Sequence, residues 1–280
     1  MAHSSHNAGR VVWRWIFGFL AALLTALTAT VCILTATLCS EDFLLRQMDA
    51  SDYYHNAAAV VREQYVNLGI PAGIPAAVFD DAVDADRLYL DIKTAVDAHY
   101  AGQDVELDKA SLIDGLYQKF VRYANSRQIA ITGEVDQGLE HLSELCVSAY
   151  VKQADHPVLR MLGRYAGRFR ATGWLIAVGL AALAAVCYWM IWRLSRLKHQ
   201  AVRRWNASLL AASWMLLLAP GAVYLSRGVD KLGVTSLSLR PLMITYVDKV
   251  LTTFLITGGV MTVAVITVGM IAVHLIKKRL

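Results

Sequence analysis

Four long apolar stretches interrupt the polar positions of this 280-residue chain. They contain no Asp, Glu, Lys or Arg, and they cover residues 16–38, 172–192, 206–225 and 251–276. A helix of about 20 apolar residues, rising about 1.5 Å per residue, crosses the roughly 30 Å hydrocarbon core of a bilayer. Because lipid offers the backbone no hydrogen-bond partners, each stretch is predicted to be a transmembrane helix.

The segment between the first two stretches, residues 39–171, carries apolar positions at helical spacing. The stripes include Ala57, Val61 and Tyr65; Leu88, Ile92, Val96 and His99; Leu112, Leu116, Phe120 and Ala124; and Leu139, Leu142, Cys146 and Ala149. Gly and Pro residues separate the stripes, and we find no convincing alternating strand pattern. The sequence therefore predicts an all-α fold, in which a helical domain of four or five helices is inserted between spans 1 and 2 of a four-span transmembrane bundle.

The end of this domain is expected to continue into the second span. Asp155 can cap a helix whose first turn contains Pro157, and no further proline occurs before Trp192. The domain and span 2 are then predicted to share one uninterrupted helix.

Basic residues predict the orientation of the spans. The three polar segments 1–15, 193–205 and 277–280 hold ten basic residues and no acidic one: Arg10, Arg14, Arg193, Arg196, Lys198, Arg203, Arg204, Lys277, Lys278 and Arg279. Basic flanks stay in the cytoplasm, so both termini are predicted to be cytoplasmic. Residues 39–171 and the shorter 226–250 are then extracytoplasmic.

The composition agrees with a multi-pass protein of the cell membrane. Hydrophobic residues make up 56% of the chain and charged residues only 18%, below the roughly 25% of soluble domains. The net charge of +5 arises at the cytoplasmic flanks, since residues 39–171 hold 20 acidic against 13 basic residues. Anionic lipid, and not nucleic acid, is therefore the expected partner of the positive charge. The first apolar run is longer than a cleaved signal peptide requires, which favours an uncleaved anchor.

Two cysteines, Cys39 and Cys146, are predicted to lie on the oxidising side of the membrane. A disulfide between them would join the outer end of span 1 to the last helical stripe of the domain. The alternative is two buried free thiols, because Cys146 lies on an apolar face.

Two basic sets are candidate binding residues. Arg160, Arg164 and Arg168 repeat every four residues before span 2 and form a stripe for an anionic ligand or lipid headgroups. The favoured alternative is that they pair with the acidic helical domain, which carries Asp80, Asp81, Asp84 and Asp86 close together. These four aspartates are more typical of helix starts than of a calcium loop. On the cytoplasmic side, a docking segment for a partner is formed by Arg193, Arg196, Lys198, Arg203 and Arg204.

Small residues recur along the spans and predict close helix packing. They are Gly18, Ala22 and Ala26 in span 1; Gly173, Ala177, Ala181 and Ala185 in span 2; and Gly258, Thr262 and Gly269 in span 4. The pattern is typical of a tight bundle or an oligomer.

No phosphate-binding loop, zinc-protease helix or nucleophile elbow occurs in the chain, and the spans lack charged residues. We therefore expect a non-enzymatic membrane protein without a cofactor, whose outer domain binds a partner or ligand and couples it to the bundle. The alternative is an oligomeric channel or permease subunit, with threonines of spans 1 and 4 lining a polar path. The order of spans is similar to that of cell-division-type and macrolide-exporter-type permeases, by topology alone.

Overall fold

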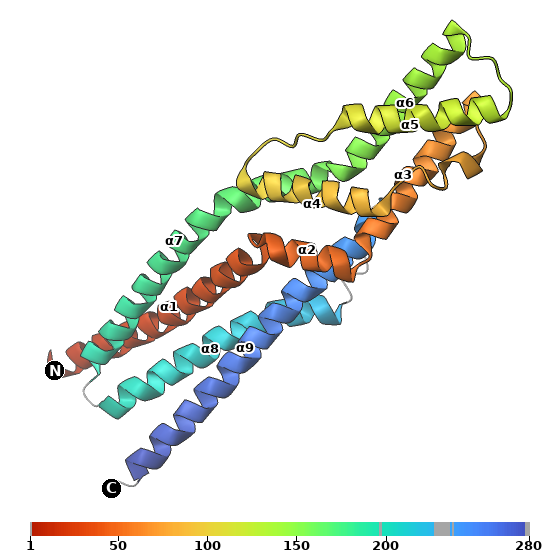
Figure 1. Ribbon diagram of the computed structural model, residues 1–280. Helices are drawn as coiled ribbons and strands as arrows, with labels where there is room; N and C mark the ends of the chain where they lie inside the picture. Colours follow the sequence, from red (N-terminus) through yellow and green to blue (C-terminus); the bar gives the residue numbers. More distant parts are fainter. Residues whose placement is uncertain (1, 196–197, 227–235, 237, 278–280) are drawn as a thin grey trace. The chain divides into compact units, whose positions relative to one another are not determined.

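The computed structural model describes residues 2–195, 198–226, 236 and 238–277 (Figure 1). Every regular element among these residues is a helix, which confirms the all-α prediction. The α-helices are α1 (Ala2–Leu38), α2 (Glu41–Ala50), α3 (Tyr53–Gly69), α4 (Ala85–Ala101), α5 (Lys109–Ser126), α6 (Gly133–Ala154), α7 (Pro157–Leu194), α8 (Lys198–Leu225) and α9 (Leu239–Lys277). Two short 3₁₀ helices, η1 (Ile70–Ala72) and η2 (Ala76–Phe79), lie between α3 and α4.

The chain divides into two compact units. The first, here called the span unit, contains Met1–Cys39, Phe169–Leu232 and Tyr246–Leu280. The second, here called the polar unit, contains Ser40–Arg168 and Gly233–Thr245.

Four helical segments are long and apolar enough to cross a membrane, as the sequence predicts: Val12–Leu38, Gly133–Leu194, His199–Leu225 and Leu239–Ile271. The helices extend past the apolar runs. Residues 198–205, expected in a connection between spans, belong to α8, and residues 239–250 belong to α9. Polar flanks continue the helical hydrogen bonds without needing to be apolar, so hydropathy alone marks the span and not the end of the helix.

In the span unit, α1 packs against α8 and α7 through small residues (Figure 1). Ala22 and Ala26 are buried, and the backbone carbonyl of Gly18 accepts a hydrogen bond of 3.0 Å from Ser208 Oγ. A Cβ at Gly173 would lie 2.6 Å from Thr35 Oγ1, so α7 approaches α1 too closely for a larger residue. The predicted packing positions Gly18, Ala22 and Ala26 of α1 and Gly173 of α7 therefore lie at helix contacts.

The small residues that repeat every four positions along α7 are Gly173, Ala177, Ala181 and Ala185. They do not all lie on the buried face of the helix. Ala177 is buried, but Ala181 and Ala185 are exposed, and Ala184 and Ile191 are buried in their place. With about 3.6 residues per turn, a step of four residues rotates the ladder by about 40°, whereas a step of seven residues drifts by only about 20°. Ala181 and Ala185 therefore do not pack against another helix within the described part of this chain.

The small residues of α9 face α8. A Cβ at Gly258 would lie 2.9 Å from Leu217 Cγ, and a Cβ at Gly269 would lie 2.2 Å from Asn206 Nδ2. Thr262 Oγ1 lies 3.1 Å from Ser213 Oγ and also donates to the carbonyl of Gly258. All three positions lie where the two helices meet.

Three helices of the polar unit, α2, α4 and α5, begin at side-chain caps. Ser40 accepts a hydrogen bond from the backbone N–H of Phe43, Asp84 from those of Asp86 and Arg87, and Asp108 from that of Ser111. Asp84 thus serves as the helix start that the sequence interpretation preferred to calcium binding. An aromatic core joins Tyr65, Phe79 and Phe120, with ring centroids 6.2 and 5.7 Å apart.

Candidate functional site at the α6–α7 corner

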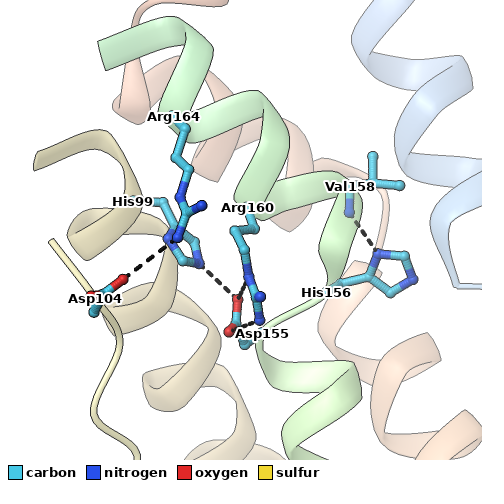
Figure 2. A network of polar contacts seen from close by, with 7 residues as sticks. All are labelled: His99, Asp104, Asp155, His156, Val158, Arg160 and Arg164. Atoms are coloured by element: carbon cyan, nitrogen blue, oxygen red, sulfur yellow. Dashed lines mark hydrogen bonds and ion pairs between the residues drawn. The ribbon is translucent and has the colours of Figure 1, made fainter. Parts of the chain in front are cut away.

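Two residues, Asp155 and His156, form the corner between α6 and α7. His156 takes the capping position of α7, since its Nδ1 accepts a hydrogen bond of 3.2 Å from the backbone N–H of Val158 (Figure 2). Pro157 fits the next position because it has no N–H to leave unpaired. Partial burial and the nearby Lys152 lower the pKa of His156, which keeps Nδ1 available as an acceptor. The expectation that Asp155 caps α7 is therefore wrong, and Asp155 instead ends α6.

The Asp155 carboxylate joins the corner to α4. It lies 2.7 Å from His99 Nε2, and it receives two hydrogen bonds from the Arg160 guanidinium, one of them 3.2 Å long (Figure 2). Burial opposes ionisation of Asp155, but the hydrogen bonds from Arg160 and His99 outweigh it and lower its pKa. His99 is 2% exposed, and its Nδ1 has no hydrogen-bond partner among the described residues. The network ties three helices together at one carboxylate.

Glycines allow α7 to lie directly on the end of α4. A Cβ at Gly163 would lie 2.7 Å from His99 Cβ, and a Cβ at Gly167 would lie 2.7 Å from the Tyr100 carbonyl oxygen. Neither distance can accommodate a side chain without movement of α4 or α7. The first three turns of α7 are therefore held by both the Asp155 network and close backbone packing.

A groove of about 390 Å³ lies beside the corner, between α3 and the end of α6. Its polar lining residues are Glu63, Gln64, Asn67, Lys152, Gln153, His156 and Ser236. Gln153 Nε2 donates a hydrogen bond of 2.9 Å to Ser238 Oγ, which attaches the start of the α9 segment to α6. A volume of this order accommodates a small ligand, and its lining offers one carboxylate, one ammonium group and several amides.

Two arginines of the basic stripe of α7 pair with acidic residues of the polar unit, although not with the cluster at residues 80–86. Arg160 binds Asp155, and Arg164 Nη2 lies 3.5 Å from Asp104 Oδ1 (Figure 2). Asp80, from the predicted acidic cluster, pairs with Arg62 instead. The stripe itself, with Arg168, borders a second hollow of about 340 Å³. The Arg164 pair is exposed on both sides, so it contributes little to stability.

The structure does not support the predicted disulfide between Cys39 and Cys146. All four cysteines, each within the described residues, are free. Both thiols are buried, and burial raises the pKa of Cys146 to about 12. The second sequence interpretation, two buried free thiols, matches the structure.

The predicted docking segment is only partly described. Arg196 lies outside the described residues, and Lys198 is described by its backbone alone. The Arg193 guanidinium lies 5.4 Å from the Trp189 ring centroid, and that of Arg204 lies 6.0 Å from the ring of Trp15. Arg203 is exposed on α8.

Sequence reasoning placed His99, Asp155 and Arg160 in three separate roles and missed that they meet. One signal was present: a histidine on an otherwise apolar stripe needs a polar partner when that stripe is buried. The identity of the partner depends on the fold, since Asp155 is 56 residues away along the chain.

The described residues thus form an all-helical fold with four helical segments apolar enough to cross a membrane. One helix, α7, runs unbroken from the corner to Leu194. This confirms the prediction of one uninterrupted helix. Comparison with models of known families, with curated proteins and with solved structures finds no match.

Proposed function

We propose that this chain is a non-enzymatic integral membrane protein of the cell membrane, whose polar unit lies outside the cytoplasm, binds a small polar ligand and passes the binding event to the spans through α7. The observation that carries the proposal is the position of His156. This residue lines the groove and also caps α7, the helix that continues into an apolar span.

The ligand class follows from the groove lining. Glu63 on α3 and Lys152 on α6 offer opposite charges, and Gln64 and Asn67 offer amide donors and acceptors. Such a lining suits a small molecule that carries both an ammonium group and a carboxylate, such as an amino acid or a dipeptide.

The transmission route uses the same corner. A ligand that contacts Lys152 or His156 acts next to Asp155, whose carboxylate holds both His99 and Arg160. Since Gly163 and Gly167 press α7 against α4, movement of the corner is passed to α7 and not absorbed by loose packing.

The binding event is proposed to reach a protein partner at the basic segment that includes Arg193, Arg203 and Arg204. Membrane lipid surrounds the spans, and no nucleic acid is expected as a partner. Replacing the basic residues of 193–205 with Gln should abolish retention of the partner during purification.

The ligand experiment measures thermal unfolding of the full chain in nanodiscs with the twenty amino acids and a set of dipeptides as probes. At least one probe should raise the unfolding temperature, and Lys152→Gln should remove the shift, whereas Lys109→Gln, an exposed lysine at the start of α5, should keep it. No shift with any probe would contradict the ligand class.

Coupling is read separately by amide hydrogen exchange. The active probe should slow exchange in residues 157–168 of α7. Rapid exchange at residues 166–172 in the absence of any probe would contradict transmission through an uninterrupted helix.

The channel or permease alternative concerns the threonines of spans 1 and 4. Thr35 Oγ1 is buried without a hydrogen-bond partner among the described residues, but other threonines bond within their own helices. Thr25, Thr28, Thr253 and Thr267 each donate to the carbonyl four residues earlier, with bonds of 2.7 to 2.8 Å, so their hydroxyls are satisfied within their own helices. The mass of the purified protein in nanodiscs tests it: a closed homo-oligomer without a bound partner would favour the pore.

A further inference from the structure

An aromatic groove of about 640 Å³ lies on the span unit, where the end of α7 meets the start of α8. Its lining residues are Ala185, Tyr188, Trp189, Trp192, Trp205 and Leu209. Four of these six side chains are aromatic, and the groove follows α7 from Ala185 to Trp192, a length of about 10 Å at about 1.5 Å per residue.

Two polar groups of the groove lining form hydrogen bonds within the span unit. Trp205 Nε1 donates a hydrogen bond of 3.1 Å to the Tyr188 carbonyl, and Tyr188 Oη lies 3.1 Å from Thr25 Oγ1. The Trp205 ring centroid is 5.8 Å from that of Tyr188 and 5.4 Å from that of Trp192. The Trp205 indole N–H and the Tyr188 phenol are thus occupied, and these two residues present their ring faces and edges.

The base of the groove is formed by buried residues. Ala21 and Ile191 are 0% exposed and Cys187 is 5% exposed, and Tyr188 and Trp205 pack against this cluster. The rings are therefore held in place by the bundle, whereas Trp189 and Trp192 remain substantially exposed.

The rim of the groove is cationic. The Arg193 guanidinium lies 5.4 Å from the centroid of Trp189, a lining residue. At the same end of the span unit, Arg204 lies over the ring of Trp15 at 6.0 Å. Stacking on an indole orients a guanidinium and leaves its N–H groups available to an anion.

The two helices that form the groove, α7 and α8, carry no carboxylate. The sequence has no Asp or Glu in residues 1–40 and none in residues 172–226, which cover α1, α8 and the apolar part of α7. The aromatic groove is apolar, has a guanidinium at its rim and carries no acidic residue on its own helices. These properties fit a ligand that consists of an acyl chain attached to an anionic headgroup.

We propose that this groove binds an anionic phospholipid, with an acyl chain against Tyr188, Trp192 and Trp205 and the phosphate at Arg193 and Arg204. A zwitterionic lipid would place its own ammonium group near both guanidinium groups, so a headgroup of net negative charge is preferred. The site does not depend on the ligand groove of the polar unit.

The test uses the full chain in phosphatidylcholine nanodiscs that contain increasing fractions of phosphatidylglycerol with brominated acyl chains, which quench nearby tryptophans. Quenching should saturate at a mole fraction about tenfold lower than with brominated phosphatidylcholine, as one charge-assisted contact implies. Replacing Trp189, Trp192 and Trp205 together with Phe should remove the emission that is quenched at low fractions of the anionic lipid, whereas Trp174→Phe should keep it.

The charge contribution is tested by Arg193→Gln combined with Arg204→Gln, which should abolish the preference for the anionic lipid. Arg170→Gln, at the other end of the span, is the matched control and should retain it. Elution as a single species of unchanged size shows that each variant is folded.

Two results would overturn the proposal. Equal quenching by the two brominated lipids, or a preference that survives in the double arginine variant, shows that the groove does not select an anionic headgroup. A dimeric particle in which neither lipid quenches Trp192 or Trp205 shows that a second copy of the chain covers the groove.

Discussion

Replacing Gly167 with Ala tests whether α7 is locked onto α4. The new Cβ would lie 2.7 Å from the Tyr100 carbonyl oxygen, and this atom belongs to the backbone and cannot rotate away. Overpacking of this kind costs about 1–3 kcal/mol. The same substitution also lowers the conformational entropy of the unfolded chain, which stabilises a helix by about 0.5–1 kcal/mol.

A matched control separates these two effects. Gly138 lies within α6, and a Cβ there meets nothing within 4 Å, so Gly138→Ala carries only the helix-propensity gain. The difference between the two variants therefore isolates the contact and should be about 1–3 kcal/mol, with Gly167→Ala the less stable.

The assay is amide hydrogen exchange at the last turn of α4 in the full chain. Since about 1.4 kcal/mol corresponds to a factor of ten, exchange in Gly167→Ala should be about 5- to 150-fold faster than in Gly138→Ala. Equal exchange in the two variants would refute the close approach of α7 and α4, and with it the transmission route.

Three further predictions concern other parts of the chain. His156, whose pKa is lowered by burial and by Lys152, should contribute stability that is complete above its ordinary pKa of 6.5 and is lost as the pH falls below that value; urea unfolding across pH 5 to 8 should show this loss, and His156→Asn, which keeps a capping acceptor that does not titrate, should flatten it. Gly258→Ala should destabilise the span unit because its Cβ would lie 2.9 Å from Leu217, whereas Gly259→Ala, with nothing within 4 Å, should not; equal thermal unfolding of the two would contradict the α8–α9 contact. Alkylation after unfolding without reductant should modify all four cysteines, and intact mass spectrometry showing only two modified would restore the disulfide between Cys39 and Cys146.

The spacing of apolar residues along the chain was sufficient to predict which segments are helical and which are apolar enough to cross a membrane. Every member of the α4 stripe, from Leu88 through Ile92 and Val96 to His99, is buried in the structure. Apolar runs without charge are costly to expose to water and satisfy their backbone only as helices in lipid, so local composition decides both properties. Continuity of α7 also followed from sequence, because nothing between Pro157 and Trp192 breaks a helix.

Tertiary structure decided which polar groups meet. Asp155 looks like a helix cap from its neighbours, yet its carboxylate holds His99 from α4 and Arg160 from α7. The pairing of Arg160 and Arg164 with Asp155 and Asp104, and not with the acidic cluster at 80–86, depends on which helix faces which. Charge spacing along a chain carries no information about those faces, because Coulomb attraction selects whichever partner the packing brings within reach.

The small residues of α7 also show what the sequence predicts and what only the tertiary structure decides. A repeat of four predicts close packing, but it rotates around the helix, so only the bundle could decide that Ala177 is buried and Ala185 faces an aromatic groove. The sequence determined that this chain is helical and apolar in four segments. The arrangement of side chains at the corner and at the groove required the fold, because their partners are distant in sequence and meet only when the helices pack.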